Sequence, residues 1–82
     1  MPIASTSLIE RIARVIAGRI ISVNADGDYA SAGDMVDEVW HLYTDDAVSI
    51  LKTMREPDQA AADVGDPAMW ERMIEAALAR GA

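Results

Sequence analysis

The stretch ILKTMREPDQAAADVGDPAMW, residues 50–70, divides the second half of the chain into separate helices. Pro57 follows an apolar helical run and disfavours helical geometry in the residue before it, so the run should end at Arg55 or Glu56. A proline also suits the first position of a helix, where its missing N–H loses no hydrogen bond. We therefore interpret Pro57 and Pro67 as two helix starts and not as parts of a recognition loop.

The helix predicted after the first proline is short. It covers residues 57–64 and ends at Gly65, which can take the left-handed conformation that terminates helices. Asp66 then caps a last helix over residues 67–80, in which apolar residues recur at three- and four-residue steps. Trp70 lies on this apolar stripe, so we expect it to be a buried core residue that anchors the last helix to the first.

The first predicted helix covers residues 7–23. Ser7 and Glu10 form a capping-box pattern, in which the serine oxygen accepts from the Glu10 amide and the glutamate reaches back. The second half of this helix is apolar nearly all round, although a surface helix needs only one apolar stripe. We therefore expect it to be central, or buried on two sides with one side at a dimer contact. The candidate self-association residues are Ile16, Ala17, Ile20 and Ile21.

A single stripe of apolar residues over residues 34–55 favours one continuous helix, about 30 Å long, with Asp34 as its cap. The step from Tyr43 to Ala47 keeps the same face. Thr44, which two acids follow, is typical of a second helix start, so a kink at this threonine is the alternative. Together these elements predict an all-α fold, a small four-helix domain with two long helices, one short helix and a C-terminal helix.

Composition bounds the classes of protein to which the chain can belong. Its 82 residues are too few for two cores, so residues 1–82 form one domain. The chain is 51% hydrophobic and 26% charged, which is typical of a globular protein, and it has no cysteine for disulfides or thiolate sites. Arg14 and Arg19 interrupt the apolar run of the first helix. We therefore expect neither a signal peptide nor a membrane span, and predict a soluble, cytoplasmic protein.

The net charge of -7 is unevenly spread. Residues 1–23 hold three arginines and one glutamate, residues 24–66 hold eleven acids against two bases, and residues 67–82 are balanced. An acidic middle repels phosphate backbones, so we predict no direct nucleic-acid binding. It suits a basic protein partner, or it simply keeps a small apolar domain in solution.

Neither candidate metal site in the sequence is complete. The polar stretch NADGDYASAGD, residues 24–34, is spaced like a calcium loop, yet no register supplies the glutamate that such a loop needs at its twelfth position. We interpret it as a turn, with weak cation binding left open. His41, the only histidine, lies four residues from both Asp37 and Asp45, but a single helix with one imidazole cannot close a metal site. We expect no metal and no cofactor.

Catalytic motifs are also missing from the sequence. No serine lies in a glycine-elbow context, and there is no glycine-rich phosphate loop. We therefore predict a protein that is not an enzyme and has no catalytic residues.

Three segments carry a resemblance to known proteins: LIERIARVI (residues 8–16), LYTDDAVSILKTMREP (residues 42–57) and WERMIEAAL (residues 70–78). They are similar to a group of small uncharacterised alpha-proteobacterial and prophage helical proteins with an "AMREP"-like helix end. The resemblance covers most of the chain, and residues 22–34 depart from it. It implies a bacterial, phage-derived intracellular protein, and it carries over no functional residue because the group has no assigned activity.

These observations predict a small non-enzymatic protein that acts through protein–protein contacts and self-associates as a homodimer. The alternative is an acidic inhibitor that mimics DNA and binds a basic nucleic-acid-handling protein. The two hypotheses differ in where the carboxylates should lie. A DNA mimic needs them in a regular array on one face, whereas surface charge that only solvates the domain is scattered.

Overall fold

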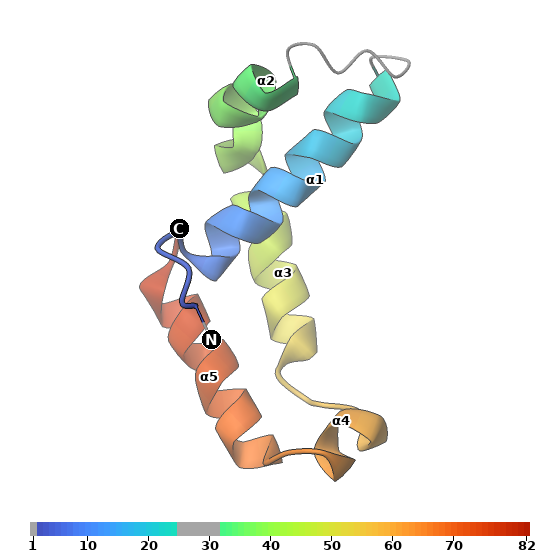
Figure 1. Cartoon of the computed structure of the whole chain (residues 1–82), viewed down its shortest axis with the longest axis vertical. Coiled ribbons are helices and arrows are strands. Elements are labelled where there is room, and N and C mark those ends of the chain that lie inside the picture. Colours follow the sequence, from blue (N-terminus) through green and yellow to red (C-terminus); the bar gives the residue numbers. More distant parts are fainter. Residues whose placement is uncertain (1, 25–31) are drawn as a thin grey trace.

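The computed structural model describes residues 2–24 and 32–82, and the described residues form helices and no strand (Figure 1). The predicted all-α class is confirmed. The elements are α1 (Leu8–Asn24), α2 (Ala32–Val39), the 3-10 helix η1 (Trp40–Tyr43), α3 (Thr44–Met54), α4 (Gln59–Asp63) and α5 (Pro67–Arg80).

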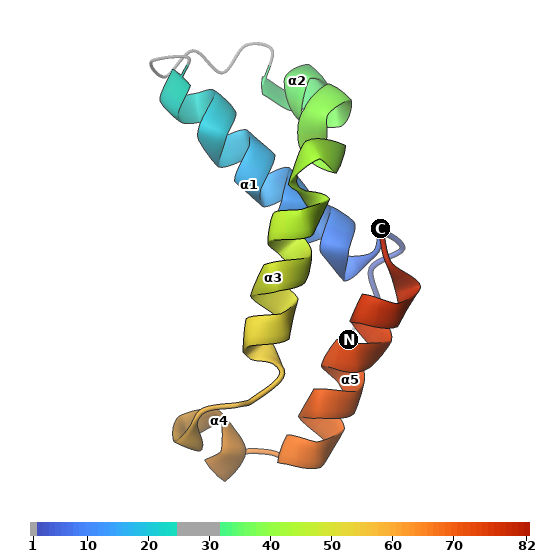
Figure 2. The same ribbon diagram turned by 180° about the vertical axis from the view of Figure 1, so that it is seen from behind.

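Helix α1 lies at the centre of the fold, as predicted. It contacts α2, η1, α3 and α5, and it crosses α3 in both opposite views of the ribbon (Figure 1, Figure 2). The Ser7 hydroxyl oxygen accepts from the amide of Glu10 at 3.0 Å, which confirms the predicted cap. The Glu10 carboxylate pairs instead with Arg14, at 2.8 Å, because that guanidinium lies one turn further along the helix.

The core lies where α1 and α3 cross and α5 joins them. Small side chains at the crossing let the two helix backbones approach closely, since an alanine projects little from its helix. Partly buried residues, among them Trp40 and Tyr43, pack around this cluster. The buried members are Ile9, Ala13, Ala47, Leu51 and Ile74.

The continuous helix predicted over residues 34–55 is wrong, and the kink stated as the alternative is confirmed. The 3-10 helix η1 separates α2 from α3, and Tyr43, its last residue, leaves α-helical geometry with φ of -111° and ψ of 12°. The Thr44 hydroxyl donates to the His41 carbonyl at 3.2 Å where α3 begins. The break changes the direction of the chain, so that α2 and α3 both pack on α1, which one straight helix could not achieve (Figure 1).

The short helix α4 begins later than predicted. Asp58 caps it, and its Oδ1 accepts from the amide of Ala61 at 2.9 Å. Pro57 therefore precedes the cap and does not occupy the first helical position. Gly65 does not take the left-handed conformation that was expected there. Among the described glycines only Gly81, which follows α5, has a positive φ, 74°.

Helix α5 begins as predicted. Pro67 is its first residue, and the carboxylate of Asp66 accepts from the amides of Ala68 and Met69 at 3.0 and 3.3 Å. Near its other end, the guanidinium of Arg80 donates to the Ser5 carbonyl at 2.9 Å, a contact between residues 75 apart in the chain. This bond holds the last turn of α5 against the segment that precedes α1.

The overall shape is elongated, with extents of 42 × 26 × 25 Å. The radius of gyration is 15.0 Å, whereas a compact domain of this length has about 12 Å. Helices α2 and α4 lie at opposite ends of the molecule, and α3 and α5 lead from the core toward α4 (Figure 2). The fold therefore leaves more apolar surface uncovered than a compact bundle would.

Candidate functional site

Arg14 joins α1 to α2 and η1. Its guanidinium donates to Asp37 at 2.6 Å and to Glu10 at 2.8 Å, and its Cζ lies 5.4 Å from the centre of the Trp40 ring. The hydrogen bond to Asp37, followed by the one to Glu10, raises the pKa of Arg14 above its usual value. Arg14 makes all three contacts, with Glu10, Asp37 and Trp40, so we interpret the cluster as one that stabilises the packing of α2 and η1 on α1.

His41 lies outside any cluster that could hold a metal. Its ring stands edge-on to Trp40, with centroids 6.3 Å apart, and the side chain is exposed. Asp37, expected on the same face, is bonded to Arg14, and η1 changes the register before Asp45. In the described ranges no group of three or more metal-ligating side chains is placed to hold an ion. The candidate cation loop, residues 24–34, falls outside those ranges at residues 25–31.

The candidate self-association residues fall on two adjacent stripes of α1. Ala17 and Ile21 continue the buried stripe of Ile9 and Ala13 at four-residue steps, so they are covered within the chain. Helix α2 provides part of this cover. A Cβ added at Gly18 would stand 3.8 Å from Cγ2 of Val36, which is ordinary contact distance.

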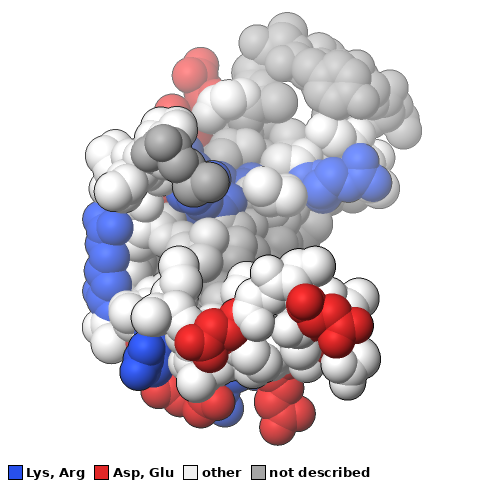
Figure 3. All heavy atoms as spheres, turned by 60° about the horizontal axis from the view of Figure 1, so that its bottom comes forward, with Lys and Arg blue, Asp and Glu red and all other residues white. Residues whose placement is uncertain are grey.

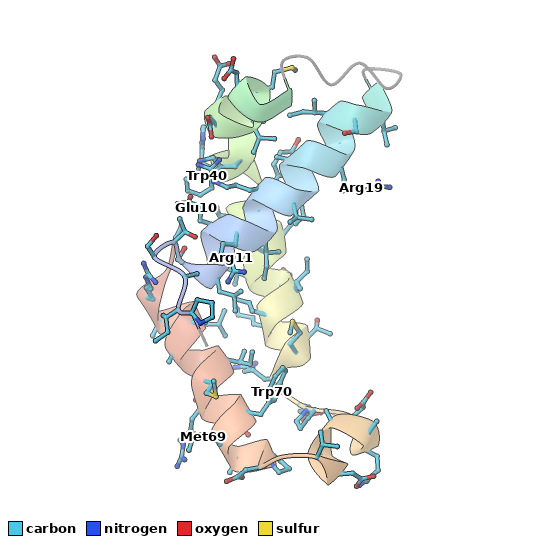
Figure 4. All side chains as sticks on the ribbon, in the orientation of Figure 1. Glu10, Arg11, Arg19, Trp40, Met69 and Trp70 are labelled. Carbon is cyan, nitrogen blue, oxygen red and sulfur yellow. The ribbon has the colours of Figure 1, made fainter. Side chains whose placement is uncertain are left out.

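The second stripe, one residue earlier at each turn, is not fully covered. Ile16 is half-buried and Ile20 is exposed. We define the α1 strip as these two isoleucines with Val15, Val23 and Ile50 of α3. Val15 and Val23 are 65% and 68% exposed. Two arginines lie at the strip. Arg11 lines the shallow hollow beside Val15, and Arg19, four residues from both Val15 and Val23, extends from the side of α1 away from α2 (Figure 4).

A second apolar surface lies between α4 and α5. It surrounds a hollow of about 320 Å³, and its side chains come from both helices and the turn between them. Val64 is 88% exposed and Met73 is 62% exposed, so this surface is open to solvent. The sequence did not distinguish this surface from the core, because its residues on the last helix belong to the same apolar stripe. We define the α4–α5 groove as Pro57, Ala61, Val64, Met69, Trp70 and Met73.

The prediction that Trp70 is a core anchor between the last helix and the first is wrong. The side chain is 37% exposed and lies outside the buried cluster. Its indole N–H donates to the carbonyl of Met54, the last residue of α3, at 2.6 Å, and the ring extends from α5 toward that helix end (Figure 4). Ile74, one turn later, reaches the core, and Ala77 and Leu78 in the second half of α5 pack against the same cluster.

Acidic residues lie on every α-helix of the described chain. Several are engaged: Glu10 and Asp37 bind Arg14, and Asp58 and Asp66 cap helices. Acidic side chains at the α4 end of the molecule stand apart from one another, with uncharged atoms between them (Figure 3). This scattered arrangement offers the DNA-mimic hypothesis no support.

No described helix is long and apolar enough to cross a bilayer. Comparison of the chain with protein-family models, with curated proteins and with solved structures finds no match. The resemblance to small alpha-proteobacterial and prophage proteins, and the cytoplasmic location, therefore stay predictions. Among the described residues, the α1 strip and the α4–α5 groove are the two surfaces suited to binding a partner.

Proposed function

We propose that this protein acts through protein–protein contact without enzymatic chemistry, and that it self-associates as a homodimer through the α1 strip. The observation that carries the proposal is the second apolar stripe of the central helix, which the other helices leave open. Val15 and Val23 are more than half exposed although α1 contacts four other elements. Exposed apolar side chains that gather on one face of a folded protein mark interaction sites.

The surface area supports the same proposal. The accessible surface is 5944 Å², whereas a folded monomer of 8.8 kDa has about 4,800 Å². The surplus is of the same order as the ~800 Å² that each partner contributes to a standard interface. A dimer contact would therefore bring the chain close to the exposure expected for its size.

The geometry of α1 suits a twofold contact. Ile16 and Ile20 of the strip are four residues apart, which is the spacing of a ridge that packs into the groove of an identical helix at an angle of about -50°. A twofold contact uses one surface twice and closes on itself. In an antiparallel contact centred on Val15, Arg11 of one copy faces Arg19 of the other.

The test is the mass in solution at micromolar concentration. We expect sedimentation to give twice the 8.8 kDa monomer mass. Val15→Asp should shift the protein to monomer, because it places a charge in the strip without disturbing the core. Val64→Asp is the matched control: the same change at an exposed valine outside the strip should leave the dimer intact.

Two outcomes would contradict the proposal: a wild-type monomer at every concentration, or a dimer that Val64→Asp breaks and Val15→Asp does not. Circular dichroism must show that both variants stay helical. Ile21→Asp is not a suitable test, because Ile21 is buried within the chain and the change would report stability.

Salt provides a second test. If arginines face each other across the contact, salt should strengthen the dimer by screening their repulsion. Salt that weakens association would indicate that opposite charges meet. That result would contradict a twofold α1 contact and favour α1 of one copy against an acidic surface of another.

A further inference from the structure

The α4–α5 groove shares no residue with the α1 strip, and its surroundings differ in charge. Its lining is apolar and exposed, and residues 55–73, which carry it, include five acids and two bases. We infer that the groove binds a basic amphipathic helix of another protein.

The lining is built to receive apolar side chains of varied shape. Met69 and Met73 are flexible and polarisable, a property used at adaptable binding surfaces. The indole N–H of Trp70 is already bonded to the Met54 carbonyl, so the rest of the ring offers apolar contact. The hydrogen bond also fixes the ring in place, which lowers the entropy lost when a partner binds.

A small polar ligand does not fit this hollow. Ligand pockets of about 300–1,000 Å³ carry polar groups that orient the ligand, and this one, about 320 Å³, is at the low end. Its carboxylate, that of Asp66, is used to cap α5. No buried side-chain polar atom of the described residues lacks a hydrogen bond. Apolar side chains projecting from a larger partner fit such a surface better.

The acidic residues near the groove favour a partner with basic residues. Glu56, Asp58, Asp63 and Asp66 lie in the segment that forms one wall, and uncharged surface separates acidic side chains at this end (Figure 3). Acids in this position repel nucleic acid and acidic proteins and attract lysine and arginine. A partner with apolar residues on one face and basic residues on the flanks complements both features.

The two-helix wall favours a helix over an extended strand. Adding a strand requires a free sheet edge, and the described residues contain no strand. An apolar groove between helices receives a helix by its residues at i, i+3, i+4 and i+7. The occupant is therefore a helix with leucine-like residues at that spacing and basic residues beside them.

The probe is a peptide of about 18 residues, five helical turns, made of leucine at those positions and lysine elsewhere. Trp70 reports binding in a Trp40→Phe background, where it is the single tryptophan. We expect a blue shift of its emission that saturates at one peptide per chain and weakens with salt. A peptide with glutamate in place of lysine, and a scrambled leucine–lysine peptide, should give no shift.

Variants of the lining locate the peptide. Met69→Gln combined with Met73→Gln removes apolar lining but keeps good helix formers, and should weaken binding about tenfold, which is about 1.4 kcal/mol. Val15→Gln removes an apolar side chain about as exposed as Met73 from the α1 strip and should leave the affinity unchanged.

Variants of the border test the charge. Glu56→Gln with Asp63→Asn should weaken binding, whereas Asp34→Asn with Glu38→Gln makes the same change in net charge on α2, at the far end, and should not. Absence of a shift, or equal binding of the glutamate or scrambled peptide, would overturn the inference. Equal losses of peptide affinity in the test variants and their controls would also overturn it. So would a homodimer that Val64→Asp breaks, since the groove would then bind a second copy of this chain.

Discussion

The two ends of this molecule hold their helices in different ways. At the α1–α3 end, η1 and α3 begin without a side-chain cap, but α3 buries Ala47 and Leu51. At the α4–α5 end, Asp58 and Asp66 cap their helices, yet α4 has no buried residue and α5 has one, Ile74. Caps satisfy backbone groups at a helix start, and packing supplies most helical stability in proteins. The contrast shows that local signals can define helices whose surfaces are left for other contacts.

Leu51→Ala should have the largest effect, because this side chain is fully buried at the packed end. We expect a loss of about 2–5 kcal/mol in the free energy of unfolding, measured by urea denaturation. Ile50→Ala, the neighbouring and exposed position, should cost much less. Equal costs would mean that the α1–α3 crossing is not the stable part of the molecule.

Trp70→Ala should cost about 2 kcal/mol, less than a buried tryptophan, because the ring is partly exposed and its loss removes one hydrogen bond and part of the apolar contact. Trp70→Phe keeps an aromatic ring but loses the indole N–H and part of the apolar contact, so it should cost about 1 kcal/mol or slightly more, and less than Trp70→Ala. A loss with Trp70→Ala as large as that with Leu51→Ala would place Trp70 in the core after all.

Asp66→Ala tests whether caps hold the open end. It removes the acceptor for two amides at the start of α5, and we expect a loss of about 1 kcal/mol. Glu75→Ala, an exposed change in the same helix, should stay within about 0.5 kcal/mol of the wild type. A cap without effect would show that packing alone holds α5.

Pro57→Ala should have the smallest effect. Pro57 precedes the cap of α4, and its contribution is mainly to restrict the unfolded chain, so the loss should stay below about 1 kcal/mol. Thermal denaturation of the variant beside Pro67→Ala measures it. A larger loss for Pro57→Ala would reveal that this half-buried ring supports the α4–α5 groove.

Local sequence signals predicted the helix ends better than they predicted the contacts between helices. Ser7 and Asp66 cap the helices to which they were assigned, since a cap depends on a few neighbouring residues. The break at Thr44 was recognisable from the start signal there. Whether the chain breaks there depends, however, on where α1 lies. The apolar stripe across residues 40–47 was compatible both with a continuous helix and with a broken one.

The candidate site was predictable in part. The excess of apolar residues on α1 was visible, but the stripe of Ala17 and Ile21 and the stripe of Ile16 and Ile20 are both apolar. The positions of α2, η1 and α3 on α1 decide which of the two is buried. The groove could not be found in this way, because it depends on α5 extending beyond α1, which leaves Trp70 outside the core.

The bond between Arg80 and Ser5 has a consequence for the order of folding. It joins residues 75 apart in the chain, so this contact closes a loop that spans almost the whole chain. The contact of α5 with α3 closes a much shorter loop, because Trp70 bonds to Met54, 16 residues earlier, and a shorter loop loses less entropy when it closes. Substitutions at Arg80 should therefore speed unfolding and hardly change the rate of folding. In kinetic terms, we expect the two ends of the chain to join last and to separate first.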